Sequence, residues 1–128
     1  MDIKEISKQI HENARAKGFW DKERNLGEML MLIVSEVSEA MEADRKDRYA
    51  DNQYIQEMEA QGYTWDNSII SFETAFRKDV KNTFEDELAD TIIRILDLAY
   101  SRNIDLEWHI KHKMKYNATR EHMHGKKY

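Results

Sequence analysis

The chain has 128 residues, of which 20 are Lys or Arg and 25 are Asp or Glu, so its formal net charge is −5. This length accommodates one domain and excludes a second sizeable core. The absence of proline, the four glycines and a charged fraction of 35% favour long helices over β-turns and predict an all-α fold. No cysteine is present, which excludes disulfides and thiolate chemistry, so any metal must have oxygen or nitrogen ligands.

The hydropathy of the chain indicates where the protein resides. Its longest apolar run, residues 29–34, is far shorter than the roughly 20 residues that a membrane span requires. The N-terminal sequence Met-Asp-Ile-Lys-Glu also lacks the apolar core of a secretory signal. We therefore expect a soluble, cytoplasmic protein with no membrane partner.

The charge is unevenly distributed along the chain. Residues 111–128 contain six basic residues and one acid, a net charge of +5, while the remainder carries −10. Three interpretations are open: an arm that binds nucleic acid, a tail that binds phosphate groups beside a metal-loaded acidic site, or a solvated C-terminus. The negative net charge of the whole chain counts against nucleic acid.

Two helices are predicted in the first third of the chain. Apolar residues at helical spacing predict a helix over 3–17, which Gly18 ends. Asn25, followed three residues later by Glu28, is typical of a capping box, so the next helix is expected to run from about 26 to 44.

A long polar stretch, residues 45–82, follows the second helix. Gly62 and the sequence Asp66-Asn67-Ser68 are turn signals within it, and we expect it to contain one or two short helices. It also carries six of the thirteen aromatic residues, namely Tyr49, Tyr54, Tyr63, Trp65, Phe72 and Phe76.

The strongest helical pattern of the chain covers residues 83–101. Asp105 is a candidate N-cap for a fourth helix that ends near residue 118, and the last ten residues are expected to form an extended arm. The chain is thus predicted to be a single domain over 1–128, a bundle of about four main helices with a long helical and aromatic insertion.

The second helix carries two acids, Glu36 and Glu39, on or beside its apolar face. When residues are placed at about 100° intervals, Glu36 falls within the apolar arc and Glu39 at its edge. A carboxylate among core side chains is unfavourable unless it is paired or bound. Glu36 is therefore either a ligand or a residue that borders the apolar stripe and reaches water.

The third long helix repeats this arrangement. Nine of the thirteen residues over 88–100 are apolar, and the polar ones share one sector of about 120° with Glu87, which predicts a mostly buried helix with a narrow acidic seam. Glu87 and Asp90 are three residues apart, like the pair on the second helix, so each pair projects from neighbouring turns of one face.

Four carboxylates converge if these two helices pack side by side. Unpaired, they would repel and raise one another's pKa values, and a divalent cation resolves that conflict. Hard oxygen ligands without cysteine favour Mg²⁺, or Mn²⁺, over zinc. Neither pair contains the Glu-x-x-His motif of di-iron bundles, so hydrolytic two-metal chemistry fits better than redox iron chemistry. Asp97, seven residues after Asp90, either extends this site or is a solvated acid on a polar face, and we expect the second.

The two acidic motifs resemble the signature of a known family. Glu36-Val-Ser-Glu39 and Glu87-Leu-Ala-Asp90 resemble the E-x-x-E and E-x-x-D motifs of the MazG-like, all-α nucleoside triphosphate pyrophosphohydrolases. The likeness extends to flanking blocks of sequence, namely Asn25-Leu26-Gly27-Glu28, Ile93-Arg94-Ile95-Leu96-Asp97, Lys113-Met114-Lys115-Tyr116-Asn117, Arg120 and His124-Gly125-Lys126.

The resemblance implies a reaction and a metal centre. The reaction is Mg²⁺-dependent cleavage between the α- and β-phosphates of a nucleoside triphosphate, which gives the monophosphate and pyrophosphate. The resemblance assigns Glu36, Glu39, Glu87 and Asp90 as the catalytic metal ligands, with one of these carboxylates orienting the attacking water.

The resemblance also implies partners and further contacts with the substrate. Members of the family assemble as dimers or higher oligomers, so a homodimer or homotetramer is expected, with sites near the subunit interfaces. Lys113, Asn117, Arg120 and Lys126 resemble the C-terminal residues that lie near the phosphates; ordinary basic surface residues are the alternative.

The chain departs from the compact family pattern, because 47 residues separate Glu39 from Glu87. Within that insertion, Tyr63 and Trp65 either stack on a nucleobase or pack a helical lid or a subunit interface. Trp20, ahead of the second helix, is a further candidate contact for the base. The insertion leaves the choice of base and sugar open.

Two classes of function are compatible with these residues. One is an enzyme that removes surplus or noncanonical nucleotides from the pool, and the other is a non-catalytic helical nucleotide-binding or protein-interaction module. The complete set of four acids favours the enzyme, because a protein without the activity can lose one of them at little structural cost.

Overall fold

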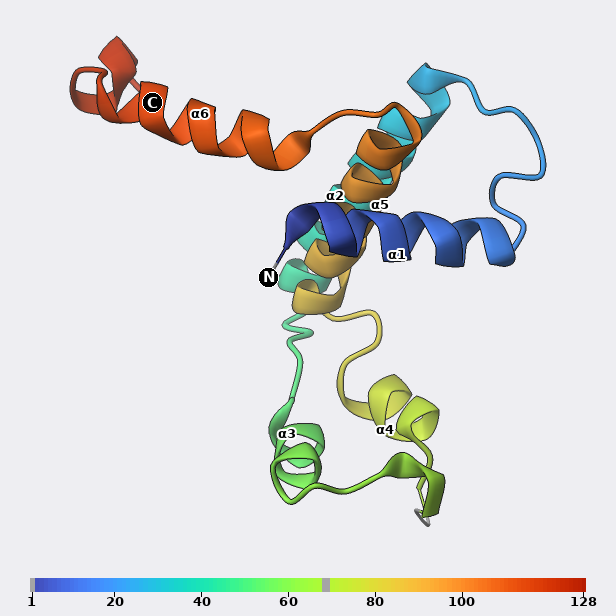
Figure 1. Cartoon of the computed structure of the whole chain (residues 1–128). Coiled ribbons are helices and arrows are strands. Elements are labelled where there is room, and N and C mark those ends of the chain that lie inside the picture. The colour runs from blue at the N-terminus through green and yellow to red at the C-terminus, as the bar shows by residue number, and fades with distance from the viewer. Residues whose placement is uncertain (1, 68–69) are drawn as a thin grey trace. The chain divides into compact units, whose positions relative to one another are not determined.

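The structure is a computed structural model that describes residues 2–67 and 70–128. Within them it contains six α-helices, two 3₁₀ turns and no β-strand, which confirms the predicted all-α fold (Figure 1). No helix in this part of the chain is both long and apolar enough to cross a membrane. The predicted turn Asp66-Asn67-Ser68 begins in the 3₁₀ turn Trp65–Asn67, and Ser68 lies outside the described residues.

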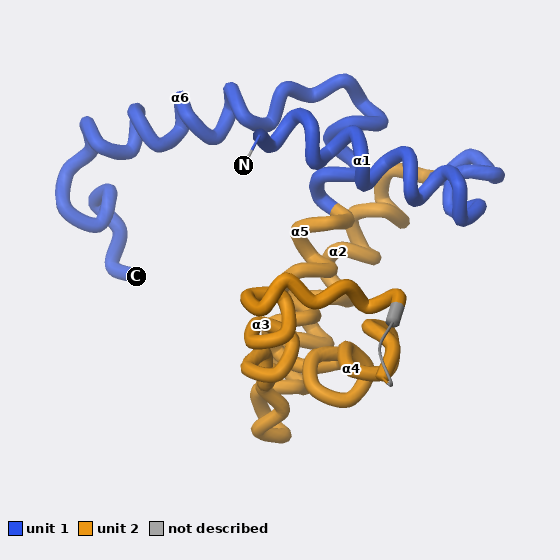
Figure 2. Tube along the Cα trace, turned by 60° about the horizontal axis from the view of Figure 1, so that its bottom comes forward, with its two compact units in different colours: residues 1–24, 95–128 blue, residues 25–94 orange. Residues whose placement is uncertain are grey.

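The helices divide between two compact units (Figure 2). Unit 1 consists of residues 1–24 and 95–128, and unit 2 consists of residues 25–94. The boundary falls within one helix, α5 (Phe84–Ser101), which contributes its first turns to unit 2 and its last turns to unit 1. The single-domain organisation over 1–128 stays a prediction.

Unit 1 contains two predicted helices, α1 (Ile3–Ala16) and α6 (Leu106–Ala118). Asp2 caps α1 by accepting hydrogen bonds from two backbone N–H groups of the first turn, and Asp105 caps α6 in the same way through one. Gly18 follows α1 with φ +84°, the left-handed conformation that suits glycine beyond a helix end. The structure therefore confirms the predicted helix boundaries at Gly18 and Asp105, and it adds Asp2 as a cap that the sequence analysis did not name.

The C-terminal segment is not the extended arm that we expected. Residues His122–Gly125 form a 3₁₀ turn in which Met123 and His124 adopt positive φ angles of 50° and 55°. Arg120 stabilises this turn, because its Nη2 donates to the carbonyl of His124 at 3.2 Å and its Nη1 lies 3.2 Å from the Nδ1 of the same residue.

Unit 2 is built on α2 (Leu26–Arg45) and the first part of α5, which lie side by side in both views (Figures 1 and 2). Asn25 caps α2 through two hydrogen bonds to its first-turn N–H groups, as the capping pattern predicts. Glu36 contacts Arg94 across the two helices, whereas Tyr49, beyond the end of α2, contacts the ring of Phe84 at the start of α5. The two helices are therefore antiparallel.

The insertion between α2 and α5 folds as two short helices, α3 (Gln53–Ala60) and α4 (Phe72–Asp79), as the sequence predicts. Its aromatic side chains pack on one another. The ring of Trp65 meets those of Tyr54, Tyr63 and Phe72 edge-on, with centroids 5.6 to 6.4 Å apart. These contacts favour the packing interpretation of Tyr63 and Trp65 over stacking on a base.

The base of the insertion is closed by backbone hydrogen bonds. The N–H of Asp51 donates to the carbonyl of Asp79 at 2.9 Å, and the N–H of Phe84 donates to the carbonyl of Arg48 at the same distance. The chain therefore leaves α2 and returns to α5 at neighbouring points, so the insertion does not hold the two helices apart.

The apolar arc of α2 is divided between two environments. Ala40 and Ala43 are buried, as is Glu36, which lies on the same side of the helix. The other side carries a row of exposed large apolar residues, to which α5 adds three. We call these nine residues the apolar stripe: Leu26, Leu30, Met31, Val34, Val37, Met41, Leu88, Ile92 and Ile93.

The first part of α5 has its polar side inward and its apolar side outward. Glu87 and Thr91 are buried, whereas Leu88 and Ile92 are 43% and 55% exposed. The prediction that this helix is mostly buried is therefore wrong for this part of the chain. The sequence pattern identifies the polar seam correctly, but the seam is the side that packs on α2.

Candidate metal centre

Three of the four predicted ligands come together in unit 2. Glu36 and Glu39 project from successive turns of α2, and Glu87 projects from the first turn of α5. One carboxylate oxygen of each lies within 4.8 Å of those of the other two. Glu36 and Glu87 are buried and Glu39 is exposed, so the cluster has a closed side and a side open to solvent.

The carboxyl group of Glu87 is strongly perturbed by this arrangement. Burial, then the hydrogen bond and the charge of Glu39, then the charges of Asp90 and Glu36 raise its pKa to about 7. Near neutral pH the Glu87 carboxyl group is therefore only partly ionised. A proton shared with Glu39 relieves the repulsion between these acids, as a bound cation also does.

Asp90 stands beside the cluster rather than in it. Its side chain is half-buried on the turn after Glu87, and it is not one of the three residues whose ligand atoms converge. Burial and the charges of Asp86 and Glu36 raise its pKa, while Arg94 and Lys81 act in the opposite direction. The field of the acidic cluster therefore extends to Asp90.

Glu36 is not an unpaired buried acid. The Nε of Arg94 donates to its Oε1 at 2.5 Å, so its charge is balanced from α5. Arg94 belongs to the polar sector of α5, but the sequence alone does not show which acid it contacts. Its partner depends on the register of the two antiparallel helices, which no local pattern contains.

The chemistry of the donor set fits a hard divalent cation. The three convergent groups offer only oxygen atoms, and two of them are shielded from solvent. Burial, together with the neighbouring acids, keeps the Glu87 carboxyl group partly protonated near pH 7. Mg²⁺ and Mn²⁺ accept such carboxylate ligands and keep waters at their remaining positions.

The predicted phosphate contacts belong to unit 1. Lys113 and Arg120 both approach the ring of Tyr116, with centroid distances of 5.1 and 5.7 Å, and Lys126 is exposed. The Oδ1 of Asn117 is buried and accepts no hydrogen bond from the described residues. The four acids belong to unit 2, and the role of these basic residues stays a prediction.

Trp20 and Asp97 belong to a polar cluster that the sequence did not indicate. The Nε1 of Trp20 donates to both carboxylate oxygens of Asp97, at 3.2 and 3.1 Å, and the Nδ1 of His11 lies 2.6 Å from Oδ1. The expectation that Asp97 is solvated is therefore wrong. His11 also meets the rings of Trp20 and Tyr100, each at a centroid distance of 5.1 Å.

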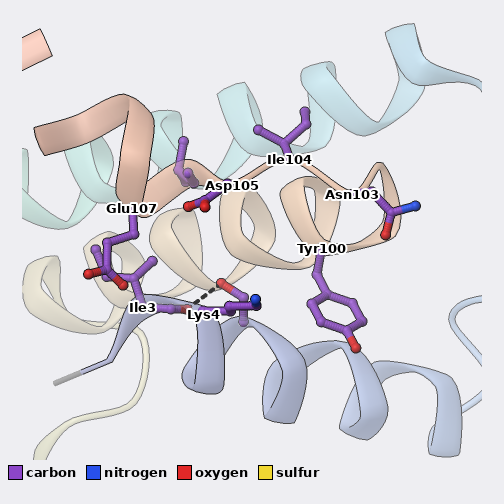
Figure 3. Close-up of a pocket in the computed structure, with 9 residues that line it drawn as sticks. Ile3, Lys4, Tyr100, Asn103, Ile104, Asp105 and Glu107 are labelled. Atoms are coloured by element: carbon purple, nitrogen blue, oxygen red, sulfur yellow. Dashed lines mark hydrogen bonds between the residues drawn. The ribbon is translucent and has the colours of Figure 1, made fainter. Parts of the chain in front are cut away.

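A separate pocket of about 220 Å³ lies in unit 1 (Figure 3). Residues of α1, the end of α5 and the start of α6 line it, among them Lys4, Tyr100, Asp105 and Glu107. Its charged groups have mixed sign, and Asp105 already serves as the N-cap of α6 by accepting a hydrogen bond from the backbone N–H of Trp108. The pocket contains none of the four predicted metal ligands.

Comparison of the chain with protein-family models, with curated proteins and with solved structures gives no match. The likeness to the MazG-like family therefore rests on the quoted motifs.

Proposed function

We propose that the chain is a Mg²⁺-dependent nucleoside triphosphate pyrophosphohydrolase of the cytoplasm, which cleaves the bond between the α- and β-phosphates. The observation that supports this most directly is the convergence of Glu36, Glu39 and Glu87 on one point, with the pKa of Glu87 raised to about 7. A site with this excess of negative charge suits the binding of a cation, and Mn²⁺ is a suitable substitute for Mg²⁺.

In this proposal Glu36, Glu39 and Glu87 hold the cation, and Asp90 completes the set from the next turn of α5. Bound Mg²⁺ supplies positive charge against the phosphate oxygens and lowers the pKa of water. The carboxylate oxygens that are not engaged in this role orient the attacking water by accepting its hydrogen bonds. Lys113, Asn117, Arg120 and Lys126 bind the phosphates, and Trp20 contacts the base.

The apolar stripe supports self-association as a homodimer or homotetramer. Five of its members, Leu26, Leu30, Val34, Val37 and Met41, recur every three or four residues along α2, and all are at least 42% exposed. Such a row resembles the seam of a helix that packs against another. A helix pair with charge inside and apolar residues outside gains stability when a second copy covers the stripe.

The test of the proposed reaction is a panel of nucleoside triphosphates incubated with Mg²⁺, with products separated by chromatography and ³¹P NMR. We expect a monophosphate and pyrophosphate for at least one substrate, and no turnover by Glu39→Gln. In ¹⁸O-labelled water, attack at the α-phosphorus places the label in the monophosphate.

Other products contradict the proposal. Orthophosphate with a nucleoside diphosphate indicates attack at the terminal phosphate, and label in pyrophosphate indicates attack at the β-phosphorus. Binding of nucleotide and Mg²⁺ without any product across the panel supports the alternative, a non-catalytic nucleotide-binding module.

A further inference from the structure

One basic residue makes direct contact with the acidic cluster, and the proposed function assigns it no role. Arg94 reaches Glu36 from α5, and its Nε donates to the Oε1 of that residue at 2.5 Å. The side chain of Glu36 is 9% exposed and that of Arg94 is 34% exposed, so the bond lies at the inner side of the cluster while part of Arg94 reaches solvent.

Arg94 balances negative charge in the metal-free cluster, but as a counter-ion alone it would oppose the binding of a metal ion. A positive charge close to a cation site lowers the affinity for the cation, because like charges repel most strongly where water is excluded. If Arg94 served only to balance charge in the empty site, its removal would favour metal binding. Its presence therefore calls for a role that outweighs this repulsion.

The burial of Glu36 suggests such a role. The residue is 7% exposed and lies beside Glu39 and Glu87, where an ionised carboxylate without a partner is strongly disfavoured. A hard cation binds a carboxylate that faces it, so a carboxylate that turns away from the other two acids is lost as a ligand. Hydrogen bonds from neighbouring residues are the usual means of orienting such ligands.

We propose that Arg94 is a positioning residue of the metal centre, whose Nε hydrogen bond holds the Glu36 carboxylate turned toward Glu39 and Glu87 before a cation arrives. This inference rests on the proposed function and deepens it, because it adds a residue that acts on a ligand rather than on the cation. The bond from Nε occupies one acceptor direction of Oε1 and leaves the other acceptor directions of the carboxylate for the metal.

The geometry also predicts which substitutions preserve the role. Arg94 uses a single donor, and its terminal NH₂ groups make no hydrogen bond to the described residues. A lysine keeps a positive charge and N–H groups that can donate to Glu36, so Arg94→Lys should retain most of the effect. Arg94→Met keeps similar apolar bulk but neither the charge nor the donor, so it removes the effect.

The experiment measures binding of Mn²⁺ to the nucleotide-free full chain by calorimetry and by the electron paramagnetic resonance signal of free Mn²⁺. Lys81→Met is the matched control, because Lys81 is an exposed cation whose charge acts on Asp90 without a hydrogen bond to the cluster. We expect unchanged or tighter binding for Lys81→Met, binding about 10- to 100-fold weaker for Arg94→Met, and near wild-type binding for Arg94→Lys.

Each other outcome counts against the inference. Mn²⁺ binding by Arg94→Met as tight as wild type, or tighter, shows that Arg94 is only a counter-ion and overturns the inference while the proposed function stands. No Mn²⁺ binding by the wild type overturns both. Circular dichroism checks the fold, and Arg94→Gln replaces Arg94→Met if that variant unfolds. Unfolding of both neutral variants assigns Arg94 to fold stability and overturns the positioning role.

Discussion

Replacement of Glu87 with glutamine should stabilise the metal-free protein at alkaline pH. Burial and the neighbouring acids raise the pKa of Glu87 in the folded state from 4.5 to about 7. Between these two values the folded protein binds more protons than the unfolded chain, so stability falls as the pH rises through this window and stays lower above it. Glutamine carries no charge at any pH and therefore escapes this loss.

The size of the effect follows from the same pKa values. At about 1.4 kcal/mol per pH unit, the interval from 4.5 to about 7 sets a ceiling of about 3 kcal/mol on the loss of unfolding free energy. Water screens the charges on the exposed side of the cluster, at Glu39, so we expect about half of this, roughly 1–2 kcal/mol. For a chain of this length, the variant should melt about 4–8 °C above wild type at pH 8.

The assay is urea unfolding in the presence of EDTA at pH 5, 6.5 and 8, followed by circular dichroism. Glu23→Gln is the control, because Glu23 is exposed and lies outside the acidic cluster. The curves of wild type and Glu87→Gln should nearly coincide at pH 5 and separate by pH 8. Equal stability at pH 8, or a loss of stability at every pH, would refute the reasoning and show that the Glu87 carboxylate contributes favourably to the fold.

Three further predictions concern the cation, the apolar stripe and the cluster around Asp97. Mg²⁺ at a hundredfold excess over its dissociation constant should add about 2.7 kcal/mol to the stability of the wild type, and Glu39→Gln should show a clearly smaller rise in melting temperature. Val34→Glu should shift the assembly toward monomer in sedimentation at micromolar concentration; a wild type that is already monomeric there contradicts the proposed role of the stripe. Asp97→Ala leaves the ring nitrogens of His11 and Trp20 without their acceptor and should lower the unfolding free energy by about 1–3 kcal/mol, while unchanged urea midpoints would show that these bonds contribute little.

The ends of the long helices were predictable because local chemistry determines them. Asn25 and Asp105 cap helices where the sequence places them, and Gly18 adopts the positive φ expected beyond α1. The three-residue spacing of the acids on two helices also predicted convergence, which the structure shows for three of the four. These features depend on separations of only a few residues.

Features that depend on register and on distant partners were not predictable in this way. The contact between Glu36 and Arg94 joins residues 58 positions apart, and that between His11 and Asp97 joins residues 86 apart. Helical periodicity identifies an apolar arc on α2 but not which half of the arc packs on α5. For the same reason, the exposure of Leu88 and Ile92 was not foreseen.

The closed base of the insertion has a consequence for the evolution of chain length. Because backbone hydrogen bonds join Arg48 to Phe84 and Asp51 to Asp79, the segment between them begins and ends at the same place. It can lengthen, shorten or be exchanged for a tight turn at only a small change in loop-closure entropy. The number of residues between Glu39 and Glu87, 47 in this chain, therefore has little influence on how close the two side chains lie. A shorter sequence with the same two motifs can build the same acidic cluster.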